Sequence, residues 1–332
     1  MAPVALPLSV LDLAMVGRGR TSADALHDAT EAAVAAERLG YGRFWVAEHH
    51  NMPAVASTAP AVLMAHIAAR TSTIRVGSGG VMLPNHAPLA VAEQFAMLEA
   101  LHPGRIDLGI GRAPGSDPHT AMALRRTGDL SAEDFPRDLV DVLALLGDER
   151  AQEACRVDRL RATPKATSHP EVVLLGSSDF SARLAGALGL PFAFAHHFAG
   201  GNTRIACELY RRAFEPSPSL AEPHLIVTAG VLVAPTHEEA FHLAGPSHLL
   251  RLGLRTGRLR PLLPPDEAAT DPERQLAASM AGDQIVGPPG DAVERLRALA
   301  AETGAAELMV TAATYGVEER TRSLELLMEA WR

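Results

Sequence analysis

Residues 74–110 read IRVGSGGVMLPNHAPLAVAEQFAMLEALHPGRIDLGI, a helix-like segment between two strand-like apolar runs. The run Ile74–Leu83 predicts a strand with a glycine-rich centre. Pro88–Leu101 predicts a helix, because proline favours the first turn of a helix. Arg105–Ile110 predicts the next strand. The order strand, helix, strand indicates two parallel strands joined by a crossover helix.

The same alternation extends along the chain in both directions. The other strands are expected at Leu8–Leu13, Arg43–Ala47, Val172–Leu175, Pro191–Ala195, His224–Ala234 and Glu307–Thr311, with a short apolar segment at Gln284–Val286. The other helices are expected at Ala23–Leu39, Pro60–Arg70, Asp117–Arg126, Phe135–Leu146, Asp179–Leu188, Thr203–Phe214, Thr236–Leu250, Glu273–Ala281, Asp291–Glu302 and Glu318–Trp331. About eight strand–helix units favour an α/β fold of the (β/α)8 TIM-barrel type, and a doubly wound sheet is the alternative.

The rest of the organisation is simple. Gly147–Pro170 is polar and shows no clear period, Leu252–Asp271 is rich in Gly, Arg and Pro, and both are expected to be inserted loops. No low-complexity linker divides the chain, so residues 1–332 are expected to form a single domain.

Composition narrows the class of protein. The 332 residues are 47% hydrophobic and 21% charged, which excludes a disordered chain. The net charge of −9 argues against nucleic-acid binding, which usually needs a basic face. Cys155 and Cys207 form neither a disulfide framework nor a CxxC motif, and this indicates a reducing, cytoplasmic location. No run of 18 apolar residues predicts a membrane span, and the N-terminal residues indicate a first strand rather than a signal peptide.

Two histidine pairs follow predicted strands, where barrel enzymes place their chemistry. The first is Glu48-His49-His50, and the second is His196-His197. Imidazole titrates near neutral pH, so either pair can supply an acid, a base or a hydrogen-bond donor, and Glu48 can orient one ring. Ordinary loop histidines are the alternative. The HxH spacing of metal-dependent barrel hydrolases is absent, so no metal site is predicted.

Glycine-rich segments lie at two further strand ends. In Gly77-Ser78-Gly79-Gly80 the missing side chains indicate either a surface kept clear for a ligand or a plain bulge. The segment Gly109–Gly115 has the pattern GxGxxxG rather than GxGxxG, so it is not a dinucleotide-binding fingerprint. What remains is Arg112, whose planar fork suits phosphate oxygens and which could equally form a surface salt bridge.

The segment Leu175–Ser181 (LGSSDFS) ends a strand and opens a helix. The free N–H groups at a helix N-terminus bind anions, and Ser178 and Ser181 can add hydroxyl donors. The alternative is a routine helix cap, which serine commonly provides.

Together these segments resemble the bacterial-luciferase-like flavin monooxygenases, and in particular single-chain members, some of which tailor aromatic polyketides in antibiotic pathways. The resemblance spans nearly the whole chain. Its most specific segments are Ala47–His50 (AEHH), Gly77–Pro118, Leu174–Ser178 (LLGSS) and Leu188–Phe198 (LGLPFAFAHHF).

The resemblance implies a (β/α)8 barrel with FMN at its C-terminal mouth, and it implies roles for individual residues. Gly79-Gly80 corresponds to a non-prolyl cis peptide against the flavin ring. His49 matches the catalytic histidine, and Glu48 precedes it. The remaining matched residues are implied to bind the cofactor: Arg112, Ser178 and Ser181 as the phosphate grip, Leu175, Gly176 and Ser177 in the same turn, and His196 near the flavin.

The resemblance also implies a reaction. Reduced FMN reacts with O2 to form a C4a-peroxide, which hydroxylates, epoxidises or carries out Baeyer–Villiger oxidation of a small organic substrate, such as an aromatic polyketide. A separate NAD(P)H:flavin reductase would supply the reduced FMN. A homodimer is implied, with the helices at Pro60–Arg70 and Pro88–Leu101 across the two-fold axis.

Three other functions stay open at the level of sequence. The same barrel can use the deazaflavin F420 for hydride transfer, and some luciferase relatives bind flavin without catalysis. A metal-dependent barrel hydrolase is the last alternative.

Overall fold

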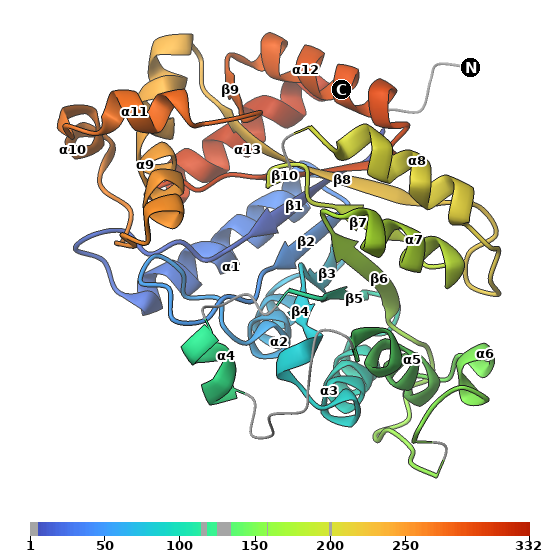
Figure 1. Cartoon of the computed structure of the whole chain (residues 1–332). Coiled ribbons are helices and arrows are strands. Elements are labelled where there is room, and N and C mark those ends of the chain that lie inside the picture. Colours follow the sequence, from blue (N-terminus) through green and yellow to red (C-terminus); the bar gives the residue numbers. More distant parts are fainter. Residues whose placement is uncertain (1–5, 114–117, 125–133, 158, 199–200) are drawn as a thin grey trace.

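The computed structural model describes residues 6–113, 118–124, 134–157, 159–198 and 201–332 (Figure 1). Its strands are Leu8–Asp12 (β1), Arg43–Val46 (β2), Arg75–Ser78 (β3), Val81–Met82 (β4), Ile106–Gly111 (β5), Glu171–Gly176 (β6), Phe192–Phe194 (β7), Leu225–Val233 (β8), Ile285–Gly287 (β9) and Glu307–Thr311 (β10). The strands pair in the order β10-β1-β2-β3-β5-β6-β7-β8, and β8 pairs with β10 to close the ring. Every pairing is parallel, and Val10 lies between Val310 and Phe44 in the register. The predicted (β/α)8 TIM barrel is therefore confirmed.

Helices surround the barrel on the outside (Figure 1). They are Ser22–Leu39 (α1), Pro60–Arg70 (α2), Pro88–Leu101 (α3), Pro118–Leu124 (α4), Phe135–Leu145 (α5), Glu149–Gln152 (α6), Asp179–Ala187 (α7), Thr203–Ala213 (α8), His237–Thr256 (α9), Pro265–Thr270 (α10), Arg274–Ser279 (α11), Pro289–Thr303 (α12) and Val317–Trp331 (α13), with a 3-10 turn at Leu83–Asn85. Of the helix predicted at Asp117–Arg126, residues 117, 125 and 126 lie outside the described residues.

Alternating side chains of the strands build two cores. Leu8 and Val10 of β1 face the helices, whereas Leu11 points into the barrel. The interior core also contains Trp45 and Met309, both buried. This period of two is the ordinary geometry of a strand whose two faces are both covered.

An ion cluster closes the end of the barrel where the strands begin. The Arg43 guanidinium lies 2.9 Å from Asp107, 2.9 Å from Glu171 and 3.1 Å from Glu307. Trp45 donates its indole N–H to Asp107 at 2.8 Å. Because these buried charges are paired, they form a fixed floor beneath the interior core.

Two sequence predictions need correction. The strand expected at Ile74–Leu83 is interrupted after Ser78, and the chain resumes as β4 beside β5. The loop expected at Leu252–Asp271 is largely helical, because α9 runs on to Thr256 and α10 follows. Gly257 ends α9 in the left-handed region at φ 69°. This glycine therefore terminates a helix and is not part of a long loop.

Within the part of the chain that the structure describes, no helix combines the length and the hydropathy that crossing a bilayer requires.

Candidate active site

A cavity of about 290 Å³ opens at the carboxyl ends of the barrel strands. Most of the residues singled out from the sequence line it: His49, Gly79, Gly80, Arg112, Leu175, Gly176, Ser177, Ser178 and Ser181. Two do not, namely Glu48 and His196. We call this space the cofactor cavity.

The glycine-rich segment forms one flat wall of the cofactor cavity. The peptide bond between Gly79 and Gly80 is cis, as the resemblance predicts. A Cβ on Gly80 would lie 2.9 Å from the carbonyl oxygen of Gly109, and a Cβ on Gly77 would lie 2.4 Å from the Trp45 ring. Side chains are therefore excluded here by close approach of the backbone and of Trp45.

Groups that can bind an anion line the opposite end of the cofactor cavity. Ser178 caps α7 and accepts from the Ser181 N–H at 3.4 Å. The Arg112 guanidinium carbon lies 4.5 Å from the centre of the Phe180 ring, a cation–π contact with the first turn of α7. Among the described residues, no carboxylate lies within ion-pair distance of Arg112. A cation beside a helix N-terminus is the arrangement that a phosphate group requires.

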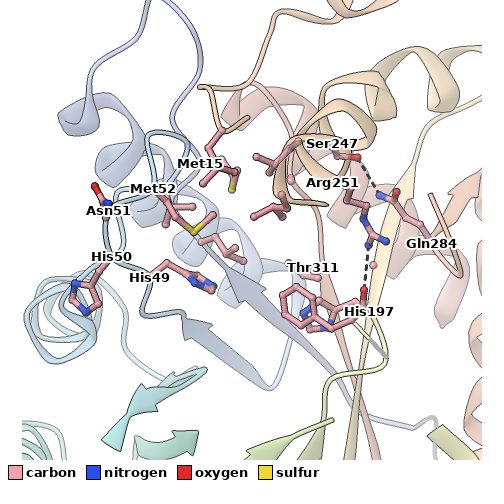
Figure 2. A pocket seen from close by; sticks show the side chains of 18 residues that line it. Met15, His49, His50, Asn51, Met52, His197, Ser247, Arg251, Gln284 and Thr311 are labelled. Atoms are coloured by element: carbon pink, nitrogen blue, oxygen red, sulfur yellow. Dashed lines mark hydrogen bonds between the residues drawn. The ribbon is translucent and has the colours of Figure 1, made fainter. Parts of the chain in front are cut away.

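A second cavity of about 370 Å³ adjoins the first, and we call it the substrate cavity (Figure 2). Leu13, His49, His197 and Phe198 line both cavities, so the two spaces meet at these side chains. Most of the other walls are apolar, and they include Met15 and Met52. Figure 2 shows His49 and His197 at the same end of this space.

Glu48 is a buried carboxylate that fixes the loop around His49. It accepts from His50 at 2.9 Å, from His86 at 2.8 Å and from the Met82 N–H at 3.0 Å. Burial disfavours the charged form of Glu48, but these hydrogen bonds outweigh burial and lower its pKa. Glu48 therefore orients other groups and does not itself face the cavity.

His197, the other member of the second histidine pair, faces both cavities, whereas His196, which the resemblance places near the flavin, lines neither. His196 turns away and bonds Thr203 Oγ1 through Nδ1 at 2.7 Å. His197 Nδ1 lies 3.2 Å from the carbonyl oxygen of Thr228, which can only accept, so Nδ1 carries the hydrogen. Burial lowers the pKa of His197 to about 4, and the ring is neutral at pH 7. The side-chain alternation of β7 is the sequence feature that predicts this difference between the two histidines. Ala193 faces the interior and its even-numbered neighbours face the helices, so the odd-numbered position 197 is expected on the interior side.

Polar residues far along the chain complete the substrate cavity, and no sequence motif marks them. Arg251 and Ser247 come from α9, and Gln284 precedes β9. Figure 2 shows these three side chains together across the cavity from Met52. Within the described residues, no group of three or more His, Cys, Asp or Glu side chains is arranged to hold a metal ion.

A family model described as luciferase-like monooxygenase matches residues 7–307. The chain belongs to this family. The luciferase-like chain is 45% identical to the Bacillus subtilis protein YvbT, with 98% of this chain and 96% of that protein covered. It is 40% identical to an Escherichia coli luciferase-like monooxygenase, with 99% and 98% covered. It is 41% identical to the N-acetyl-S-alkylcysteine monooxygenase of Bacillus subtilis, with 76% and 75% covered.

Solved structures agree with the luciferase-like assignment. Apo-MsnO8 is 38% identical, with a TM-score of 0.89 and 98% of each chain covered. The oxygenating constituent of 3,6-diketocamphane monooxygenase from Pseudomonas putida, a Baeyer–Villiger enzyme in complex with FMN, has a TM-score of 0.72 at 20% identity. An F420-dependent secondary alcohol dehydrogenase has a TM-score of 0.70 at 16% identity. At such identities the last two share the fold with this chain, and their cofactors are their own.

Proposed function

We propose that this luciferase-like protein is a two-component FMN-dependent monooxygenase. A separate NAD(P)H:flavin reductase supplies reduced FMN, and O2 oxygenates a small organic substrate. The observation that carries the proposal is the pair of joined cavities. One has a glycine wall and an anion-binding end, the other is mostly apolar, and His49 lies between them.

The residues of the cofactor cavity fit FMN. Arg112, Ser178 and the N-terminus of α7 would hold the phosphate, because they combine a cation without a described acidic partner with free N–H groups. Gly79 and Gly80 line the cavity with backbone alone, and a planar ring would lie against this wall. When bound, reduced flavin supplies the activation of O2, and the protein supplies orientation and exclusion of water.

The residues at the junction would manage protons. His49 is the candidate to hold or deliver a proton beside the reacting atoms, since it lines both cavities. His197 is neutral, and its Nε2 can accept a hydrogen bond from a substrate or an oxygen species. Glu48 is a positioning residue, because it acts through His50, His86 and the Met82 N–H.

The relatives suggest where to begin the search for a substrate. A relative at 41% identity is named for N-acetyl-S-alkylcysteine, so thioether sulfur is the first acceptor to test. An aromatic polyketide is the second substrate class to test.

A homodimer and a cytoplasmic location belong to the same proposal. Exposed apolar side chains on α2 and α3 support a partner at this surface, namely Val62, Met97 and Leu101. Both cysteines are free thiols, which suits a reducing compartment.

The decisive experiment measures oxygen transfer from labelled O2. The purified chain, a flavin reductase, NADH, FMN and N-acetyl-S-benzylcysteine are incubated under 18O2, and products are analysed by mass spectrometry. A sulfoxide carrying one 18O is expected. His49→Ala should lower its rate by about 10²- to 10⁴-fold, as for loss of a general acid or base. His27→Ala, at an exposed histidine on α1, is the control and should leave the rate unchanged.

The same preparation separates the alternatives. Binding of reduced F420 without binding of reduced FMN would replace the proposal with hydride transfer. Tight FMN binding without labelled product from any thioether or polyketide would favour a flavin-binding protein without catalysis.

A further inference from the structure

A half-buried arginine in the wall of the substrate cavity lacks an anionic partner. Arg251 donates to the carbonyl oxygen of Ala281 at 2.8 Å and to that of His197 at 3.4 Å (Figure 2). Among the described residues, no carboxylate lies within 4.0 Å of its guanidinium. The exposed Asp283 attracts Arg251 electrostatically but forms no ion pair with it.

The backbone opposite Arg251 is shaped to let this side chain enter the cavity. A Cβ on Gly230 of β8 would lie 3.3 Å from Arg251 Nη2 and 3.4 Å from Gln284 Cγ. Glycine at this position therefore leaves room for both polar side chains. Gln284 Nε2 lies 3.4 Å from Ser247 Oγ, a long contact, so turning its N–H2 group toward an anion costs little.

The rest of the substrate cavity is mostly apolar. Met15, Met52, Val55 and Leu254 line it, and the single arginine is its only described cationic side chain of the Lys or Arg type. A cation without an ion-pair partner in such surroundings loses hydration that its two carbonyl hydrogen bonds replace only in part. An anionic ligand with one negative charge would restore that compensation, and a guanidinium fork matches the two oxygens of a carboxylate.

We propose that the substrate is a carboxylate with an apolar body, held by Arg251 at its charged end. The Gln284 amide N–H2 would add a hydrogen bond to the same carboxylate, while the Ser247 hydroxyl donates to the Ala244 carbonyl oxygen. The apolar body then extends toward His49, where the cofactor cavity begins. This inference rests on the proposed function in taking this cavity as the substrate site, and it names the class of substrate.

The test measures binding without flavin or O2, so its outcome is independent of whether the chain oxygenates anything. Octanoate and octanamide have nearly the same shape and differ in charge. Their dissociation constants are measured by isothermal titration calorimetry at pH 7 for the wild type, Arg251→Gln and Arg255→Gln. Arg255 is the matched control, because it is an exposed arginine one turn further along α9 and does not line the cavity.

The wild type should bind octanoate at least about tenfold more tightly than octanamide, a difference of about 1.4 kcal/mol. Arg251→Gln should abolish that preference and leave octanamide binding unchanged, whereas Arg255→Gln should keep it. Equal binding of the two ligands by the wild type would overturn the inference. So would no binding of octanoate at millimolar concentration, or a preference that survives Arg251→Gln.

Discussion

Replacing Arg112 by glutamine should weaken the binding of FMN and leave the binding of riboflavin unchanged. The two flavins have the same ring system and differ in the phosphate. Arg112 lies at the end of the cofactor cavity where Ser178 caps α7, and its guanidinium contacts the Phe180 ring. If this end holds the phosphate, the substitution removes charged hydrogen bonds from FMN alone.

The expected magnitude follows from the exposure of the side chain. A hydrogen bond to a charged group contributes about 1.5–3 kcal/mol. Arg112 is only half-buried in an open cavity, and solvent screening places the effect in the lower half of that range, at about 1.5–2 kcal/mol. The dissociation constant of reduced FMN should therefore rise by about 10- to 30-fold.

Anaerobic calorimetric titration of photoreduced FMN and riboflavin measures both constants. Arg183→Gln is the matched control, because Arg183 is an exposed arginine on α7 outside both cavities. This variant should bind both flavins like the wild type. If Arg112→Gln weakens riboflavin as much as FMN, Arg112 acts on the ring or on the fold, and the phosphate assignment is refuted. Unchanged FMN affinity would refute it as well.

Two further predictions concern stability. Arg43→Ala should lower the free energy of unfolding by about 3 kcal/mol in urea titrations, the lower end for breaking a buried ion pair, because buried Glu307 loses its arginine partner whereas Asp107 keeps Arg75. Arg38→Ala breaks an exposed ion pair with Glu325 and should cost under about 1 kcal/mol; similar losses in both variants would contradict the argument. His197 has a pKa of about 4 in the folded chain against about 6.5 when unfolded, so the unfolded state takes the proton first as the pH falls. The resulting stabilisation, about 3 kcal/mol, is complete above about pH 6.5 and is lost toward about pH 4. Between about pH 7 and about pH 4.5, His197→Asn should lose less stability than the wild type, and an equal loss would show that His197 does not titrate in this way.

Local pattern predicts most of the strands and helices and favours a barrel, whereas the closure itself comes from the pairing of β8 with β10. The periods of two and 3.6, the proline at the start of α3 and the glycine stops locate strands and helices, because these signals act over a few residues. The glycine wall and the Arg112 end were also visible, since missing side chains and a helix start are local features. At Leu252–Asp271 glycine and proline predict a loop, whereas in the structure Gly257 ends α9 and Pro265 begins α10.

Only the tertiary structure decided which side chains contact one another. The sequence predicts that Glu48 orients one ring of the adjacent histidine pair, but only the fold shows that His86 and the Met82 N–H also bind this buried carboxylate. Arg251 carries no motif, and only the packing of α9 over the end of β8 brings it to the same cavity as His49. The sequence by itself thus determined the elements and the order in which they surround the barrel. Which ends of those elements share a cavity depends on contacts between residues far apart in the chain, and only the folded backbone sets those distances.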